Sequence, residues 1–242
     1  MYNAFLIVLH TQSYLFIFNI ILDLTILRRI MTKTFYNHVL NNDFCKRDYD
    51  DKIIESINLQ DNDLEKVFSL NKTKSNAKLI ENATKIIVGT LTSPKGMQNG
   101  YYYTSCTRNV VFNTLDEAFD ENGKFAKLKK DLSLSPNNKQ IINQIESKLF
   151  DFKIAFIDVI NQAIRTKNSP NDSDIFMYSL DLNAFKHCNK NQIFICTSKN
   201  AKLCMEKIVK NNNLSIDLTN VFLCQQDRFH FNKQLWLDLL KK

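Results

Sequence analysis

The sequence is poor in residues that build metal sites and in residues that interrupt regular structure. Its 242 residues include only four glycines, three prolines, one tryptophan and four histidines. No two of its six cysteines have the C-x-x-C spacing, and no Cys/His run matches a zinc or iron–sulfur framework. Most of the cysteines stand among apolar residues, as Cys196 and Cys224 do. We therefore expect reduced thiols in the core, a reducing compartment, and neither a metal ion nor another cofactor.

The composition is that of a folded, basic protein. Hydrophobic residues make up 44% of the chain and charged residues 24%, which permits a full core and argues against wholesale disorder. The formal net charge of +7 and the pI near 9.0 are compatible with a polyanionic partner. A bias towards Lys, Asn and Ile also follows from an AT-rich genome, so composition alone does not establish nucleic-acid binding.

The N-terminal segment, residues 4–27, is strongly apolar and is followed by Arg28 and Arg29. It is long enough to cross a bilayer. However, Asp23 and other polar residues interrupt it, and an acid in mid-membrane costs roughly 2.5–3.5 kcal/mol on insertion scales. No basic region precedes the run and no small-residue cleavage site follows it. Three interpretations stay open: translation that starts at Met31, a membrane anchor with the following domain in the cytoplasm, or a signal peptide.

The chain divides into three parts by its pattern of apolar and polar residues. Residues 1–30 form the apolar segment, residues 31–82 a polar, mostly helical extension that ends in a linker, and residues 83–242 an α/β domain. In the extension, apolar residues recur at helical spacing, and residues 71–76 are typical of a solvated linker. We expect the protein to be a cytoplasmic monomer.

From Thr84 onward, short apolar runs alternate with amphipathic stretches of helical length. This pattern implies crossover connections and a parallel sheet that is covered on both faces. In such sheets ligands bind beyond the carboxyl ends of the strands. We therefore expect functional residues directly after four predicted strands: Lys85–Gly89, Lys153–Val159, Gln192–Thr197 and Asn220–Cys224.

The segment after the first strand concentrates unusual residues. Three of the four glycines (Gly89, Gly96 and Gly100) fall within twelve residues, and three consecutive tyrosines and an Arg-Asn pair follow them. Glycine is needed where a backbone approaches a ligand closely or adopts a positive φ. The segment is either a ligand-binding surface or a mobile glycine loop whose tyrosines pack on the core.

The order of these pieces resembles the uracil-DNA glycosylase superfamily, particularly its mismatch-specific and hypoxanthine-acting branches. The family shows a strand, a G-[TSI]-x-P-type loop, an aromatic pair, and an Asn before a Phe-rich helix. The chain has Ile86-Ile-Val-Gly-Thr-Leu-Thr-Ser-Pro94, Gly100-Tyr-Tyr-Tyr103 and Arg108-Asn109-Val-Val-Phe112. The likeness continues at Ile154-Ala-Phe-Ile-Asp-Val-Ile160, at Arg165 and residues 169–175, and at Ile193-Phe-Ile-Cys-Thr-Ser-Lys-Asn-Ala201. It covers about residues 80–242.

The resemblance implies a three-layer αβα fold with a four-stranded parallel sheet in the order 2-1-3-4. It also implies a DNA glycosylase of base excision repair that removes a deaminated base, uracil or hypoxanthine, from DNA. Such an enzyme flips the base out of the stack, reads its edge and hydrolyses the N-glycosidic bond. DNA is then the partner, and no metal is needed.

The resemblance and the residue types together nominate a set of site residues. The catalytic candidates are an amide that offers a donor and an acceptor and a carboxylate just past the second strand. Backbone N–H groups after the first strand, with tyrosine rings, are expected to hold the base. Cationic and hydroxyl side chains nearby are expected to bind phosphates. The residues are, for catalysis, Asn109 and Asp158; for base binding, Gly89, Thr90, Leu91, Tyr102 and Tyr103; and for DNA binding, Lys95, Arg108, Ser198, Lys199, Arg228 and His230.

Several of these residues have a purely structural alternative. Asn109, Asp158 and Ser198 could each serve as a helix cap. The chain also departs from the family pattern, because its last loop, residues 223–231, lacks the usual proline and serine. Thr92 and Ser93 stand where related branches carry a catalytic Asn or Asp. A glycosylase-like protein that binds nucleic acid or a nucleobase without cleavage is therefore the second hypothesis, and a membrane-attached scaffold is the third.

Overall fold

A computed structural model describes residues 44–46, 76–104, 110–165, 175–226 and 230–242. The chain divides into two compact units, residues 1–44 and 45–242, and the first is described only at Phe44. Residues 4–27, the candidate membrane segment, lie outside the described residues. Within the described ranges, no helix has the length and apolar character that a membrane crossing requires.

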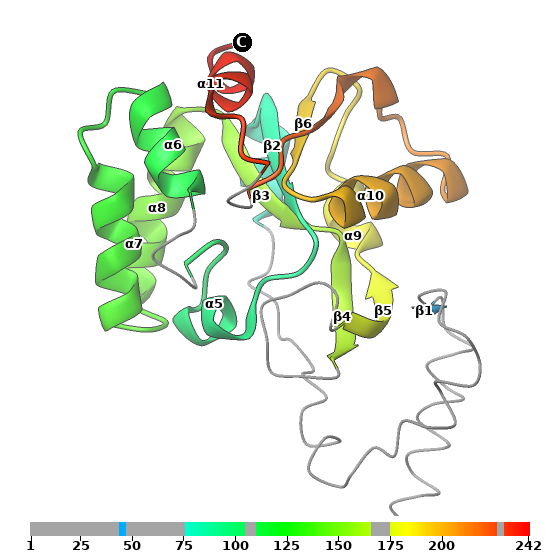
Figure 1. Cartoon of the computed structure of the whole chain (residues 1–242), viewed down its shortest axis with the longest axis horizontal. Helices are drawn as coiled ribbons and strands as arrows, with labels where there is room; N and C mark the ends of the chain where they lie inside the picture. The colour runs from blue at the N-terminus through cyan, green and yellow to red at the C-terminus, as the bar shows by residue number, and fades with distance from the viewer. Residues whose placement is uncertain (1–43, 47–75, 105–109, 166–174, 227–229) are drawn as a thin grey trace, which may run out of the picture. The chain divides into compact units, whose positions relative to one another are not determined.

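The second unit contains both helices and strands (Figure 1), with four consecutive helices between β2 and β3 among the described residues. The strands are β1 (Phe44–Lys46), β2 (Lys85–Gly89), β3 (Ile154–Asp158), β4 (Ile160–Arg165), β5 (Ile175–Leu180), β6 (Ile193–Cys196) and β7 (Val221–Leu223). The helices are α4 (Ala77–Asn82), α5 (Pro94–Asn99), α6 (Val111–Ala118), α7 (Lys124–Leu134), α8 (Lys139–Asp151), α9 (Leu182–Phe185), α10 (Lys199–Asn211) and α11 (Lys233–Lys241), with a short 3-10 turn, η2 (Leu218–Asn220).

The central sheet has four parallel strands in the order β3-β2-β6-β7. In chain order this is 2-1-3-4, so the predicted fold class and strand order are confirmed. The strand β2 is central because its apolar core is complete on both faces: Ile86, Ile87 and Val88 are all 0% exposed. A parallel strand covered on both faces needs such a continuous apolar run.

Helices cover the sheet on both sides, which makes three αβα layers (Figure 1). The helices α4 and α8 pack against β3, while α10 packs against β2, β6 and β7. On α10, the buried residues Ala201, Cys204, Met205 and Ile208 recur at helical spacing and form its sheet-facing stripe. The helices α6 and α7 pack together beside α8, and α11 packs on α6.

The structure adds elements that the alternation pattern does not predict. Residues 94–99 of the glycine-rich segment form the short helix α5, which Ser93 caps through a hydrogen bond from the Gly96 N–H at 3.2 Å. Gly100 ends this helix at a φ of 82°, a left-handed conformation that favours glycine. The strands β4 and β5 pair antiparallel and lie outside the central four-stranded sheet.

Candidate active site

Two strand ends meet at the carboxyl edge of the central sheet. The strand β2 ends at Gly89 and β3 ends at Asp158, and these two residues are partners in the parallel register. Backbone hydrogen bonds continue just beyond them, from Val159 N–H to the Gly89 carbonyl at 2.9 Å and from Ile160 N–H to the Thr90 carbonyl at 3.0 Å. The edge where α/β sheets bind ligands therefore carries Gly89 and Asp158 side by side.

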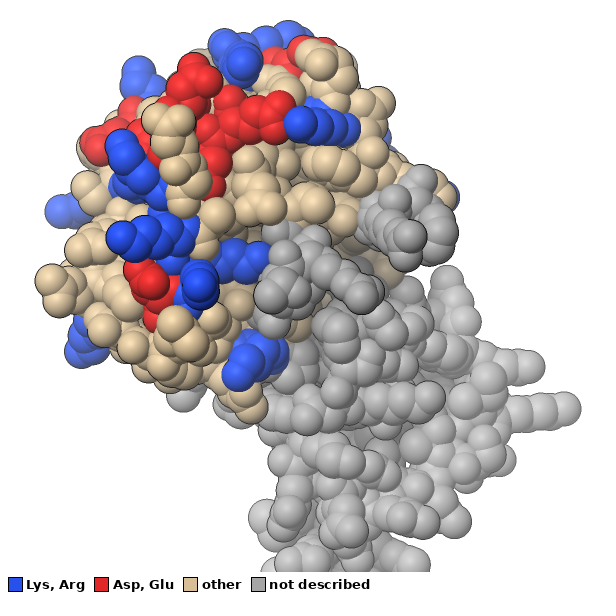
Figure 2. Space-filling view, turned by 60° about the vertical axis from the view of Figure 1, so that its left-hand side comes forward, with Lys and Arg blue, Asp and Glu red and all other residues tan. Residues whose placement is uncertain are grey.

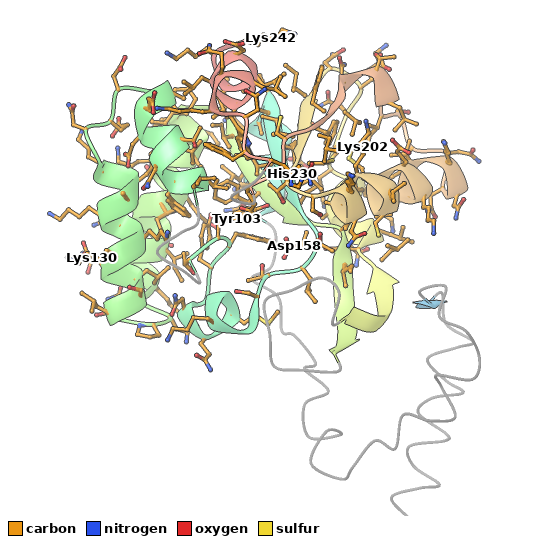
Figure 3. All side chains as sticks on the ribbon, viewed as in Figure 1. Tyr103, Lys130, Asp158, Lys202, His230 and Lys242 are labelled. Atoms are coloured by element: carbon orange, nitrogen blue, oxygen red, sulfur yellow. The ribbon has the colours of Figure 1, made fainter. Side chains whose placement is uncertain are left out.

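Gly89 allows two polar side chains to meet over its Cα. A Cβ at this position would collide with the Oδ1 atom of Asp158 and would lie 2.8 Å from the hydroxyl oxygen of Tyr103. Figure 3 shows Tyr103 and Asp158 next to each other at this edge, below His230 in that view. The glycine is thus required by close packing, and it brings together three of the predicted site residues.

Asp158 is a buried carboxylate that the first loop holds in place. It is 3% exposed. Its Oδ2 atom accepts hydrogen bonds from the Thr92 N–H at 2.6 Å and from the Thr92 hydroxyl at 2.5 Å. Both hydrogen bonds are donated to the same oxygen, so Thr92 fixes the position of the Asp158 side chain. The sequence pattern does not predict this role for Thr92, which stands where related branches carry a catalytic Asn or Asp.

The three consecutive tyrosines pack on the core around Phe156. Tyr101, Tyr102 and Tyr103 are 1%, 3% and 9% exposed, and each ring contacts Phe156 edge-on. The alternative in which the tyrosines pack on the core therefore holds for Tyr101 and Tyr102. Base contact by Tyr102 stays a prediction. Only the hydroxyl of Tyr103 is placed at the site by these contacts.

The Tyr103 hydroxyl is a buried hydrogen-bond donor. Among the described residues it has no hydrogen-bond partner. Burial, and next the negative charge of Asp158, raise the pKa of Tyr103 well above its usual value, so the group keeps its proton. Tyr103 also has a φ of 54°, a left-handed conformation that costs a non-glycine residue roughly 1–3 kcal/mol. Backbone strain and an unpaired buried hydroxyl at one residue are typical of functional positions.

The start of α10 borders the same edge. The hydroxyls of Thr90 and Ser198 lie 2.7 Å apart, which ties the end of β2 to the first residue before α10. Ser198 also accepts a hydrogen bond from the Ala201 N–H at 3.0 Å. It therefore caps α10, which is the structural role considered for it in the sequence. Lys199 is exposed, as are Lys95 and His230, so all three cationic or titratable side chains are accessible to a polyanion. Leu91 is 8% exposed and belongs to the core.

The end of β7 contributes a residue that sequence reasoning missed. The Gln226 N–H donates to the Thr197 carbonyl at 3.3 Å, which places Gln226 beside the end of β6. The Gln226 Oε1 atom is buried and has no hydrogen-bond partner among the described residues. The rule that sites follow strand ends pointed to the segment after Leu223, but nothing distinguished this glutamine from its neighbour Gln225.

Three predicted site residues, Arg108, Asn109 and Arg228, lie outside the described residues, so their roles stay predictions. In the described ranges, no group of three or more His, Cys, Asp or Glu side chains is arranged to hold a metal ion. Cys188, Cys196, Cys204 and Cys224 take part in no disulfide bond.

The face shown in Figure 2 carries charges of both signs. Acidic side chains gather mainly in its upper part, and Lys and Arg side chains lie around them and below. A hollow of about 390 Å³ between α7 and α8 follows the same pattern, because Asp131 lines it together with Lys124, Lys127 and Lys148. This hollow is built from helices other than those at the carboxyl edge of the sheet.

No protein-family model matches the chain, and a comparison with curated proteins finds no match. A comparison with solved structures finds the solution NMR structure of a Methanosarcina acetivorans protein described as a "putative Uracil DNA glycosylase". That structure is similar to this chain with a TM-score of 0.44 and 17% sequence identity, over 66% of this chain and 91% of the other.

Proposed function

We propose that the protein is a DNA glycosylase that removes a deaminated base, uracil or hypoxanthine, from DNA. The observation that carries the proposal is the pairing of a buried Asp158 with the unpartnered Tyr103 hydroxyl over Gly89, at the ligand-binding edge of the sheet. The sequence resemblance to uracil-DNA glycosylases supports the same function, because its motifs include the loop and the strand ends that carry these residues.

The proposed reaction uses the two polar groups in different roles. The bond between C1′ of the deoxyribose and the base nitrogen breaks, and its electron pair leaves with the base. The Tyr103 hydroxyl donates a hydrogen bond to a base carbonyl as negative charge develops there. The Asp158 carboxylate stabilises the oxocarbenium-like sugar, then takes a proton from the water that adds to C1′. The proton taken by Asp158 then passes through solvent to the base anion, which regenerates the carboxylate and leaves an abasic site and the free base.

DNA contacts in this proposal come from around the edge. Lys95, Lys199 and His230 are exposed and suited to phosphate contacts, and Arg108 and Arg228 are proposed to join them. Asn109 is proposed to read the edge of the flipped base with its carboxamide. Neither catalytic step assigns a role to a metal ion, so we expect activity to survive chelation.

The test is a single-turnover assay on oligonucleotides that contain one uracil, hypoxanthine or xanthine, with abasic sites detected by alkaline cleavage. Wild-type protein should generate abasic sites on at least one of them, with and without EDTA. Asp158→Asn should lower the rate by roughly 100-fold or more, because it removes the carboxylate and keeps the shape. The matched control is Asp131→Asn on α7, which should act as wild type. Tight DNA binding without any cleavage would reject the enzyme hypothesis. It would favour the alternative, a glycosylase-like protein that binds nucleic acid without cleaving it.

A further inference from the structure

We infer that the hollow between α7 and α8 binds a free nucleoside monophosphate, with the phosphate on lysine ammonium groups and the base beside Asp131. The inference goes beyond the proposed glycosylase function and does not depend on it, because no residue that lines the hollow belongs to the strand ends at the carboxyl edge. The volume of about 390 Å³ lies at the small end of the range of ligand pockets, which suits one small molecule.

The first support is that two packed helices each turn one polar stripe towards the hollow. The helices α7 and α8 follow each other in the chain, pack together, and lie on the side of the molecule that Figure 2 brings forward. On each helix the lining residues recur at spacings of three and four, which places them on one helix face. They include Lys124, Lys127, Leu128 and Asp131 on α7, and Ser147 and Lys148 on α8.

The second support is that one end of the hollow carries ammonium groups held in fixed places. The Nζ atom of Lys148 bonds to the Glu121 carboxylate and lies 5.6 Å from the centre of the Phe125 ring. Its side chain is only 24% exposed. Lys124 contacts the same carboxylate, with its Nζ atom 3.4 Å from Oε2. Because Glu121 orients both lysines before any ligand arrives, less side-chain entropy is lost when an anion binds.

The third support is a positive charge that Glu121 does not offset. Lys127 follows Lys124 by one turn of α7, its side chain is exposed, and it makes no ion pair with any described residue. Ser147 on the facing helix adds an exposed hydroxyl. A phosphate at this end of the hollow would therefore accept charge-assisted hydrogen bonds from ammonium groups and a further one from the hydroxyl.

Asp131 determines what the rest of the ligand must be. It lies about 10 Å further along the axis of α7 than Lys124. Its carboxylate repels an anion and only accepts hydrogen bonds, so the far end of the hollow requires N–H or O–H donors. Leu128, half-buried between the two ends, offers an apolar surface to a flat ring. A nucleoside monophosphate with an amino-bearing base has these parts in the same order: the phosphate, the ring and the N–H donors.

The experiment is equilibrium dialysis of the full chain against AMP, ribose 5-phosphate, adenosine and inorganic phosphate. Wild-type protein should bind AMP roughly 10-fold more tightly than each of the others, because only AMP reaches both ends of the hollow. Lys127→Gln should lower the AMP affinity roughly 10-fold, the effect of one hydrogen bond between charged groups. Lys130→Gln, at an exposed position on the same helix, is the matched control and should bind as wild type does. Asp131→Ala should weaken AMP while inorganic phosphate binds at least as well, since a repelling carboxylate is gone.

Two further variants locate the binding and check the fold. Asp158→Asn should leave the AMP affinity unchanged, and a loss there would place the nucleotide at the carboxyl edge and overturn the inference. Thermal melting shows whether each variant is folded, and Ser147→Ala, which should also weaken AMP, replaces Lys127→Gln if that variant is not.

Three other results would overturn the nucleotide site: equal affinity for AMP and inorganic phosphate, equal affinity for AMP and ribose 5-phosphate, or an AMP affinity that Lys127→Gln leaves unchanged. A short single-stranded oligonucleotide that binds more tightly than AMP, and that depends on Lys127, would assign the hollow to a nucleic-acid strand instead.

Discussion

At the residue scale, Gly89 shows how one missing side chain organises the site. Its Cα is the common neighbour of a buried carboxylate and a buried hydroxyl, and neither could stay where it is beside a larger residue. The requirement is spatial, and it differs from that at Gly100 and Gly123, where the left-handed backbone is what favours glycine.

Gly89→Ala should destabilise the protein by about 1–3 kcal/mol, because the added methyl overlaps the Asp158 carboxylate and the Tyr103 hydroxyl. Urea denaturation measures the change. The double variant Gly89→Ala/Tyr103→Phe should recover part of the loss, since one of the two colliding oxygens is gone. Strictly additive effects of the two substitutions would contradict the close approach of Tyr103 to Gly89.

Thr92 is the residue that positions the catalytic candidate. Thr92→Val keeps the size of the side chain and the N–H donor but removes the hydroxyl that donates to Asp158. We expect a single-turnover rate roughly 10-fold lower, the effect of one hydrogen bond to a charged group, with DNA affinity unchanged. Thr92→Ser should restore the rate, because it returns the donor. An equal loss in the Val and Ser variants would point to packing alone.

At the scale of elements, the site is assembled from three junctions between a strand and the segment that follows it. The loop after β2 supplies Gly89 and Thr92, the end of β3 supplies Asp158, and the turn from β6 into α10 supplies Thr197 and Ser198. These junctions are adjacent because the strands are parallel and in register. The N-terminus of α10 adds the partial positive charge of its backbone N–H groups to the same edge.

Lys199, the first residue of α10, should contribute to DNA affinity without contributing to chemistry. Its side chain is exposed, and a phosphate contact there would release one counterion. Lys199→Ala should weaken binding to all sequences and reduce the slope of log K against log salt by about one. Fluorescence anisotropy from 50 to 200 mM salt measures the slope. The matched control is Lys130→Ala on α7, at an exposed position, where an unchanged slope is expected. If the slope is unchanged in Lys199→Ala as well, Lys199 makes no phosphate contact.

At the scale of the whole molecule, buried thiols and tyrosine hydroxyls with raised pKa values make the stability of the fold depend on alkaline pH. Burial raises the pKa of the Cys188 and Cys196 thiols to about 12 and that of Cys224 to about 11. Burial also raises the pKa of Tyr101 and Tyr103 well above 10.0. In each case the folded state holds a proton that the unfolded state releases near its ordinary pKa, about 8.5 for cysteine and about 10 for tyrosine.

The free energy of unfolding should therefore fall as the pH rises above about 8.5, because the folded protein binds more protons than the unfolded chain. The contribution of these groups is fully present below their unfolded pKa values and is lost as the pH approaches 11–12 for the thiols. Urea midpoints at pH 7.5, 9.5 and 10.5 measure the decline. Tyr103→Phe should show a shallower decline above pH 10. A constant midpoint across this range would contradict the burial of these groups.

Much of the architecture follows from the sequence by itself. The strand near Lys85–Gly89 is found with the same bounds, and each of the other three predicted strands is shorter by one residue at each end. Buried parallel strands need continuous apolar runs, and amphipathic helices need a periodic stripe, so both leave a local signature. The strand order 2-1-3-4 came from the family resemblance, because pairing between strands is not encoded in any one segment.

The site was determined only in part by the sequence, and the remainder depended on tertiary structure. Glycine concentration and strand-end position were enough to nominate Gly89, Tyr103 and Asp158, which the fold brings together. The hydrogen bonds from Thr92 to Asp158 and the unpartnered oxygen of Gln226 depend on contacts across 66 residues and on burial beside another strand. Neither leaves a local pattern, since threonine and glutamine are common in exposed loops. The sequence determined which strand ends carry polar groups, and the parallel register decided which of those groups meet.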